Sequence, residues 1–236
     1  MAAAHKGSQF HIQKYVNDYT EELNQYILTS SPSLLAFMDR SLEVNWKSPL
    51  KHNNYYEFQD DFLNVLIEDQ KELAKYETML RQYWPKKGPV WDGIAIVNGH
   101  NHQKGLLLVE AKAYTNETLS KIKASSPTSL HVIKQSIHVT QKAFGSNSSD
   151  DPWLSRYYQL ANRLTFLSIL NDKLHIPTWL VLCNFVEDEY YKPTTLKKWL
   201  QHYQLVFNRL DIQPHVNLMN KIVSIYVPAI HNNSSC

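Results

Sequence analysis

The sequence predicts an α/β protein, because stretches with helical spacing of apolar residues alternate with short, continuous apolar runs. Three of these runs, residues 90–97, 106–113 and 177–186, have the length of buried strands. The 236 residues are 43% hydrophobic and 19% charged, a composition typical of a globular protein and not of a disordered chain. That length predicts a single domain over residues 1–236.

Residues 1–54 are expected to form a helical N-terminal extension. Apolar spacing predicts a helix over 10–28, and a Ser-Ser-Pro-Ser break precedes a second, short helix over 34–42. Loop-like sequence then continues to residue 54. A longer helix is predicted over 55–83, where four apolar side chains fall on one face: Phe58, Phe62, Val65 and Leu66.

The spacing of apolar residues changes after residue 89. Residues 90–97 and 106–113 are predicted to be strands, and the turn-rich segment 98–105 between them indicates a hairpin. Helices are expected over 129–144 and 153–171. The second of these helices places four side chains on its inner face: Tyr157, Leu160, Leu164 and Leu167. The pattern ends with a strand over 177–186, a helix over 194–209 and a strand over 221–227.

Composition excludes several classes of protein. Six glycines cannot build a phosphate-binding loop of the P-loop or Rossmann type, and two cysteines exclude a cysteine-based zinc site. The chain begins without an apolar segment, so we expect no signal peptide. Its longest apolar runs are too short to span a bilayer. We therefore expect a cytoplasmic protein that has no membrane partner.

Three charged residues interrupt the two apolar strands of the predicted hairpin. Glu110 and Lys112 are two residues apart in a strand, so they share a face. If Val97 lies opposite Gly105, Asp92 falls opposite Glu110. Because buried charges must be paired or bind a metal, this grouping indicates a site. The alternative is an exposed Glu110–Lys112 ion pair, with Asp92 capping a turn.

Two neighbouring carboxylates repel each other, and a divalent cation removes that repulsion. Hard oxygen ligands favour Mg²⁺ or Mn²⁺ over zinc, and Mg²⁺ retains several waters and so needs few protein ligands. A lysine beside such a metal can hold the attacking water or stabilise a phosphoryl oxygen. This set of residues therefore points to phosphodiester hydrolysis.

Asp92, followed by Glu110-Ala-Lys112 at the end of an apolar strand, resembles the PD-(D/E)XK nuclease superfamily. The residue before the first acid is Trp91 where the motif has proline. The resemblance implies a metal bound by Asp92, Glu110 and the carbonyl of Ala111, with Lys112 positioning the attacking water.

The resemblance also implies a restriction-endonuclease-like core over residues 55–186, with a mixed central sheet flanked by helices. A C-terminal helix and strand, in residues 187–236, would follow this core. Members of the superfamily often carry another acid on the first core helix. Glu57 is the first candidate here and Asp61 the second, since they lie four residues apart on the predicted helix.

The predicted helix over 153–171 carries Arg156, Gln159 and Arg163 on one side. These residues could contact a phosphate backbone or the site, or they could form a solvated face. Arginine suits phosphate because it can donate two parallel hydrogen bonds. A basic excess agrees with a phosphate contact, since residues 104–163 hold eight basic and four acidic residues.

The sequence thus predicts a Mg²⁺- or Mn²⁺-dependent nuclease that hydrolyses the phosphodiester bonds of DNA or RNA, with DNA the first candidate. A net charge of +2 argues against tight, non-specific coating of nucleic acid. The alternatives are a non-catalytic nucleic-acid-binding or protein-interaction module on the same fold, and a metal hydrolase acting on small molecules. The sequence leaves the oligomeric state open.

Overall fold

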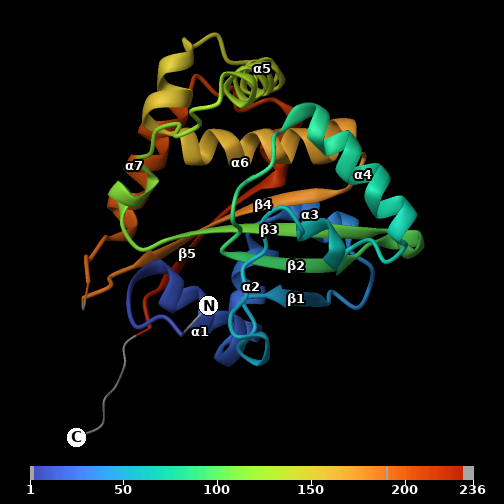
Figure 1. Cartoon of the computed structure of the whole chain (residues 1–236). Helices are drawn as coiled ribbons and strands as arrows, with labels where there is room; N and C mark the ends of the chain where they lie inside the picture. Colours follow the sequence, from blue (N-terminus) through green and yellow to red (C-terminus); the bar gives the residue numbers. More distant parts are fainter. Residues whose placement is uncertain (1–2, 190, 231–236) are drawn as a thin grey trace, which may run out of the picture.

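The computed structural model describes residues 3–189 and 191–230, and its centre is a five-stranded sheet covered by helices on both faces (Figure 1). The strands are β1 (Val44–Ser48), β2 (Gly93–Asn98), β3 (Lys104–Lys112), β4 (Thr178–Val186) and β5 (Ile222–Pro228). They lie side by side in chain order. Strands β1, β2 and β3 pair antiparallel, whereas β3, β4 and β5 pair parallel. The α/β class and the mixed sheet are therefore confirmed.

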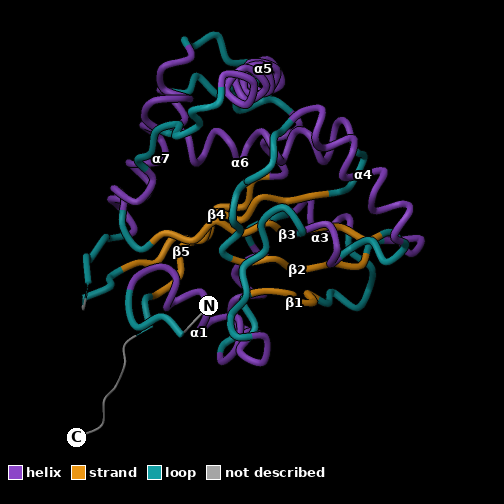
Figure 2. Tube along the Cα trace, in the orientation of Figure 1, coloured by secondary structure: helices purple, strands orange, loops and turns teal. Residues whose placement is uncertain are grey.

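The helices form a layer on each side of this sheet (Figure 2). They are α1 (Gly7–Asp18), α2 (Thr20–Thr29), α3 (Pro32–Phe37), α4 (Gln70–Tyr83), α5 (Pro127–Ala143), α6 (Tyr158–Ser168) and α7 (Leu196–Arg209). Alternate residues of β4 enter two cores. Leu180 and Leu182 pack with α4 to α7, whereas Val181 and Cys183 pack with α1 to α3. This double burial explains the continuous apolar runs. Within the described residues, no helix combines the length and apolar character needed to cross a bilayer.

The N-terminal extension differs from the sequence prediction in two ways. It is not helical throughout, because β1 adds an edge strand that sequence analysis assigned to a loop. In β1, Val44, Trp46 and Ser48 turn inward while Asn45 is exposed, an alternation over only five residues. The helix predicted over 10–28 is also two helices, because the backbone of Tyr19 leaves the helical conformation.

The helix predicted over 55–83 is wrong in its first half. Helix α4 begins only at Gln70, where the Asp69 carboxylate accepts hydrogen bonds from the first free backbone N–H groups of Lys71 and Glu72, at 3.0 and 2.8 Å. The preceding residues form a loop that contains a short 3₁₀ turn, Phe62–Val65. Phe62 and Leu63 of this turn are buried without an α-helix.

Helices α5 and α6 connect the parallel strands β3 and β4, which places α6 across the sheet near the end of β3 (Figure 1). The predicted helix over 153–171 contains α6 flanked by two π-helical turns, Pro152–Arg156 and Ile169–Lys173. Its expected inner face is confirmed, since all four side chains are buried: Tyr157, Leu160, Leu164 and Leu167. The helix predicted over 34–42 is α3, which ends at Phe37 because the backbone of Met38 is extended. The remaining predicted strands and helices agree with the structure to within three residues.

Candidate functional site

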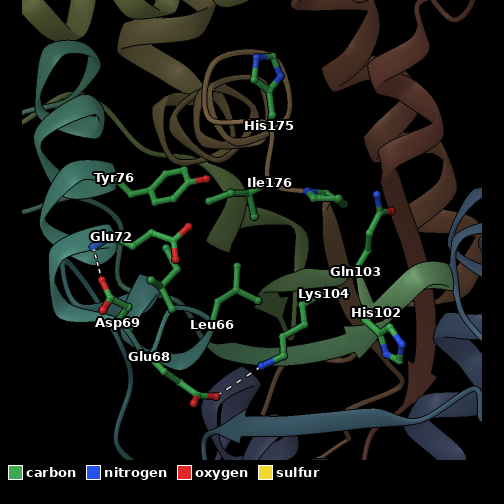
Figure 3. A pocket seen from close by; sticks show the side chains of 12 residues that line it. Leu66, Glu68, Asp69, Glu72, Tyr76, His102, Gln103, Lys104, His175 and Ile176 are labelled. Carbon is green, nitrogen blue, oxygen red and sulfur yellow. Dashed lines mark hydrogen bonds and ion pairs between the residues drawn. The ribbon is translucent and has the colours of Figure 1, made fainter.

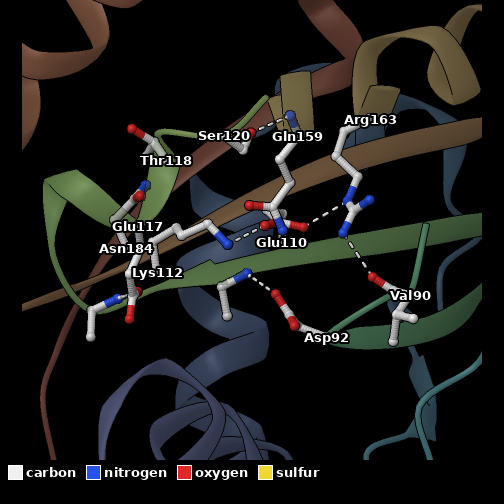
Figure 4. A network of polar contacts seen from close by, with 12 residues as sticks. Val90, Asp92, Glu110, Lys112, Glu117, Thr118, Ser120, Gln159, Arg163 and Asn184 are labelled. Atoms are coloured by element: carbon white, nitrogen blue, oxygen red, sulfur yellow. Dashed lines mark hydrogen bonds and ion pairs between the residues drawn. The ribbon is translucent and has the colours of Figure 1, made fainter. Parts of the chain in front are cut away.

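Strand pairing brings the three predicted charges together. Val97 lies opposite Gly105 and Gly93 opposite Val109, the register expected from the sequence. Asp92 immediately precedes β2, and its carboxylate oxygen Oδ2 accepts a hydrogen bond from the backbone N–H of Ala111 at 2.7 Å. This contact sets Asp92 beside β3 at the point where Glu110 and Lys112 share the face covered by α6 (Figure 4).

Glu110 is buried and is held by two cationic side chains. Lys112 Nζ pairs with its Oε1, and Arg163 Nε donates to its Oε2 at 2.6 Å. Burial alone raises the pKa of Glu110, but the charges of Arg163 and Lys112 reverse this and hold it below its ordinary value. Burial lowers the pKa of Lys112, but the carboxylates of Glu110 and Asp92 outweigh this effect and raise the pKa above its ordinary value. The pair is therefore ionised at neutral pH.

Asp92 is in a different electrostatic position. It is half-buried and forms no ion pair with any described residue. Burial raises the pKa of Asp92 to about 7, the charge of Glu110 adds to the rise, and Lys112 opposes it only in part. This carboxylate therefore lacks a cation of its own.

These donors fit a hard divalent cation. Asp92 offers a carboxylate without a cationic partner, and the N–H and C=O of one strand residue point to the same side, so the Ala111 carbonyl also faces Asp92. Among residues 3–189 and 191–230, no three His, Cys, Asp or Glu side chains form a metal-binding group. A metal here would therefore rest on two carboxylates, a carbonyl and water, which Mg²⁺ tolerates.

Glu57 reaches the same region from a loop and not from a helix. Its Oε1 accepts a hydrogen bond from Gln9 Nε2 of α1 at 2.9 Å. Burial raises the pKa of Glu57 above its ordinary value. Asp61 instead bonds locally, accepting from the Tyr56 hydroxyl at 2.7 Å and from the backbone N–H of Gln59 at 3.0 Å. The structure thus brings Glu57, and not Asp61, to the wall of a cleft that also contains Asp92.

Arg163 is a structural centre of the site. Its side chain is 4% exposed, and besides Glu110 it donates to the carbonyl of Val90 at 2.7 Å and to Asn162 Oδ1 at 2.8 Å. Its guanidinium also lies 4.7 Å from the ring centre of Trp91. Arg163 therefore ties the start of β2 to β3, and protein groups accept from three of its five N–H donors. Of the alternatives that sequence analysis left open for Arg163, the structure places it in the site. We call Asp92, Glu110, Lys112 and Arg163 the charged cluster.

The other two polar residues predicted to share this helix side are separated by the structure. The side chain of Gln159 lies beside Glu110 (Figure 4), and its backbone N–H donates to the Ser120 hydroxyl at 2.7 Å. Arg156 belongs to the π-helical turn before α6, is exposed, and donates to the Tyr157 hydroxyl at 3.3 Å. Arg156 does not line the cleft.

The cleft above the charged cluster has a volume of about 1060 Å³. Asp92, Gln159 and Arg163 lie in its lining. Four exposed lysines also line it, and none forms an ion pair with a described residue: Lys86, Lys87, Lys121 and Lys123. We call it the basic cleft. Sequence analysis did not single out these lysines, although two of them lie in the segment with the basic excess.

A second hollow, of about 710 Å³, lies at the opposite end of β3 (Figure 3). Glu72, Tyr76 and His175 face it, and Lys104 Nζ lies 3.5 Å from Glu68 Oε1 at its edge. It is remote from the charged cluster, and no member of that cluster lines it. The basic cleft is therefore the stronger candidate site.

The fold and site together define an α/β protein with a buried Glu–Lys–Arg cluster beneath a lysine-lined cleft. Comparison of the chain with protein-family models, curated proteins and solved structures finds no match. The function must therefore be argued from the site itself.

Proposed function

We propose that this protein is a Mg²⁺- or Mn²⁺-dependent nuclease, built on a restriction-endonuclease-like core and acting on nucleic acid, with DNA the first candidate substrate and RNA the second. One observation carries the proposal: Asp92, Glu110 and Lys112 converge beneath a cleft lined by four unpaired lysines. Unpaired lysines attract phosphates, and the carboxylates offer the oxygen ligands of a metal. Few other chemistries need both features at one point.

Each residue of the site then has a role. Asp92, Glu110 and the Ala111 carbonyl would hold the metal, which when bound supplies charge stabilisation and an activated water. Lys112 has its ammonium fixed by Glu110, where it can orient the attacking water or donate to a phosphate oxygen. Glu57 adds a carboxylate on the cleft wall. Gln159, beside Glu110, can donate to the substrate.

A non-catalytic nucleic-acid-binding module is the second candidate, and one observation favours it. Both oxygens of Glu110 already bind cationic side chains, so Asp92 is the only carboxylate of the charged cluster without a cationic partner. A basic cleft would still bind nucleic acid if the carboxylates held no metal. The two candidates therefore differ in metal binding and cleavage, and not in nucleic-acid binding.

Cleavage of labelled DNA and RNA strands and duplexes tests the proposal, with Mg²⁺, Mn²⁺ or EDTA present. We expect metal-dependent products from the wild type, and a loss of at least about 100-fold in Lys112→Ala and Asp92→Asn. Lys142→Ala, which removes an exposed lysine of α5 outside the cleft, should cleave normally. Thermal unfolding of each variant separates lost chemistry from lost structure.

The result that contradicts the nuclease is cleavage that survives both substitutions. Calorimetry with Mn²⁺ decides between the two candidates when no substrate is cut. Heat of binding that disappears in Asp92→Asn favours the metal site, whereas nucleic-acid binding without any metal binding favours the non-catalytic module.

A further inference from the structure

An aromatic pair lies directly beyond the charged cluster. Glu110, Lys112 and Tyr114 occupy alternate positions, and Tyr114 keeps an extended backbone, with φ −154° and ψ 158°. At the rise of a strand, Tyr114 follows Lys112 by about 7 Å. Its ring centre lies 5.7 Å from that of Tyr191, and the two rings meet edge to face at 69°. Both tyrosines are half-buried, so part of each ring faces solvent.

Two lysines accompany these rings. Lys192 Nζ lies 4.1 Å from the centre of the Tyr114 ring and 5.2 Å from that of Tyr191. Lys6 Nζ lies 5.3 Å from the Tyr191 ring. Both lysines are exposed, and neither pairs with an acid among the described residues. We call these four residues the aromatic platform.

The charged cluster adjoins both the basic cleft and the aromatic platform, since Asp92 and Arg163 line the cleft and Lys112 lies two residues before Tyr114. Val90 and Arg163 lie on one side of Asp92, and Lys112 and Glu117 lie on the other (Figure 4). The backbone N–H of Ala113 donates to Glu117 Oε2 at 2.6 Å, so the chain leading to Tyr114 continues on the Glu117 side. A nucleic-acid strand that contacts both the cleft and the platform would therefore lie beside the charged cluster.

Aromatic rings beside a positively charged groove are typical of sites for unpaired strands, because the rings stack on bases and the groove follows the phosphates. In a duplex the base faces are already stacked inside the helix and cannot meet such rings. The cleft, at about 1060 Å³, is comparable to sites for drug-sized ligands, roughly 300–1,000 Å³. It therefore has room for a few nucleotides.

We propose that the site takes a single strand of nucleic acid, with phosphates on the lysines of the basic cleft and an unpaired base on Tyr114 and Tyr191. This inference rests on the proposed function for its chemistry, and it adds the class of substrate. Because recognition depends on unpaired bases, the proposal applies to a DNA strand and to an RNA strand.

Binding without metal tests this inference separately from catalysis. Fluorescence anisotropy in EDTA would measure the full chain against a labelled DNA strand of about 12 nucleotides, the RNA strand of the same sequence, and the matched duplex. We expect at least about 10-fold tighter binding of either strand than of the duplex. Equal or tighter binding of the duplex would overturn the inference.

Substitutions locate the binding. Tyr114→Ala should weaken strand binding by about 5- to 150-fold, the usual range for one stacked base, while Tyr114→Phe keeps the ring and the affinity. Lys121→Ala with Lys123→Ala should lower the salt dependence by about 1.4 in the log–log slope, since each strand phosphate contributes about 0.7. Tyr19→Ala, on an exposed tyrosine between α1 and α2, is the aromatic control.

The outcomes keep the two proposals apart. Tight strand binding that depends on Tyr114, without cleavage in Mg²⁺ or Mn²⁺, refutes the nuclease and retains the single-strand site. Cleavage of duplex and strand at equal rates supports the nuclease and refutes the single-strand site. A folded Tyr114→Ala protein that binds the strand as tightly as the wild type refutes the single-strand site.

Discussion

Replacing Arg163 by methionine tests the electrostatic reasoning about the charged cluster most directly. Methionine matches much of the length of arginine but carries no charge and no donor. The substitution removes the 2.6 Å ion pair with Glu110 and the hydrogen bonds to Val90 and Asn162. Glu110 is only 4% exposed and would then depend on Lys112 alone for compensation.

Removing one partner of a buried ion pair typically costs about 3–5 kcal/mol, and we expect a loss of stability in this range near neutral pH. The loss should depend on pH. In the wild type, the folded pKa of Glu110 lies below its ordinary value, so its contribution is complete above the ordinary value. It disappears as the pH falls through the folded pKa. The difference between wild type and Arg163→Met should therefore shrink below about pH 4.

Urea unfolding, followed by tryptophan fluorescence, measures the difference at each pH. Arg156→Met is the matched control, because Arg156 is exposed, and it should change stability by less than about 0.5 kcal/mol. The double variant Glu110→Leu with Arg163→Met should recover part of the loss, since no unpaired carboxylate remains to be buried. A loss under about 1 kcal/mol, or one that is equal at every pH, would refute the buried ion pair as described.

Two further predictions concern other charges. Because the pKa of Asp92 is raised to about 7, the native state retains a proton that the unfolded chain releases, and stability falls as the pH rises from about 4 to 7. Asp92→Asn should remove this pH dependence of stability, and it should stabilise the metal-free protein by on the order of 1–2 kcal/mol above neutral pH. Thermal melts measured across this pH range would contradict the prediction if the variant kept the wild-type profile. Asp188→Ala breaks the buried 2.8 Å contact between Asp188 Oδ2 and His11 Nε2. It should lower the free energy of unfolding, measured in urea, by about 2 kcal/mol or more. No measurable change would show that the contact does not stabilise the fold.

The sheet could be predicted from sequence where the information is local. Strands β2 and β3 are joined by a short turn, and the expected pairing of Val97 with Gly105 is confirmed. That register brings Asp92 beside β3, where it binds the backbone N–H of Ala111. Strand β4 is buried on both faces and is therefore continuously apolar. Strand β1 could not be predicted in the same way, because it is a five-residue edge strand whose alternation fits a loop equally well.

The positions of the site residues depended on longer-range contacts. Glu57 is held by Gln9, which is 48 residues away in sequence, and no local pattern could indicate that pair. The π-helical turn before α6 interrupts the regular helix between Arg156 and Gln159. Because the predicted helix was assumed to be regular, its spacing placed Arg156 beside Arg163 on one face. The lysines of the cleft come from two segments that only the folded chain brings together: Lys86 and Lys87, and Lys121 and Lys123.

The charges of the cluster decide which substitutions can report on function alone. With both acids ionised, Asp92, Glu110, Lys112 and Arg163 sum to zero, so the side chains balance one another before any ligand binds. Glu110 is the centre of that balance, and its replacement disturbs two cations at once. Asp92 stands at its edge, with one hydrogen bond to Ala111 and no ion pair among the described residues. A loss of cleavage in Asp92→Asn without a loss of stability therefore assigns Asp92 to the chemistry, whereas the same loss in Glu110→Gln would leave chemistry and folding mixed.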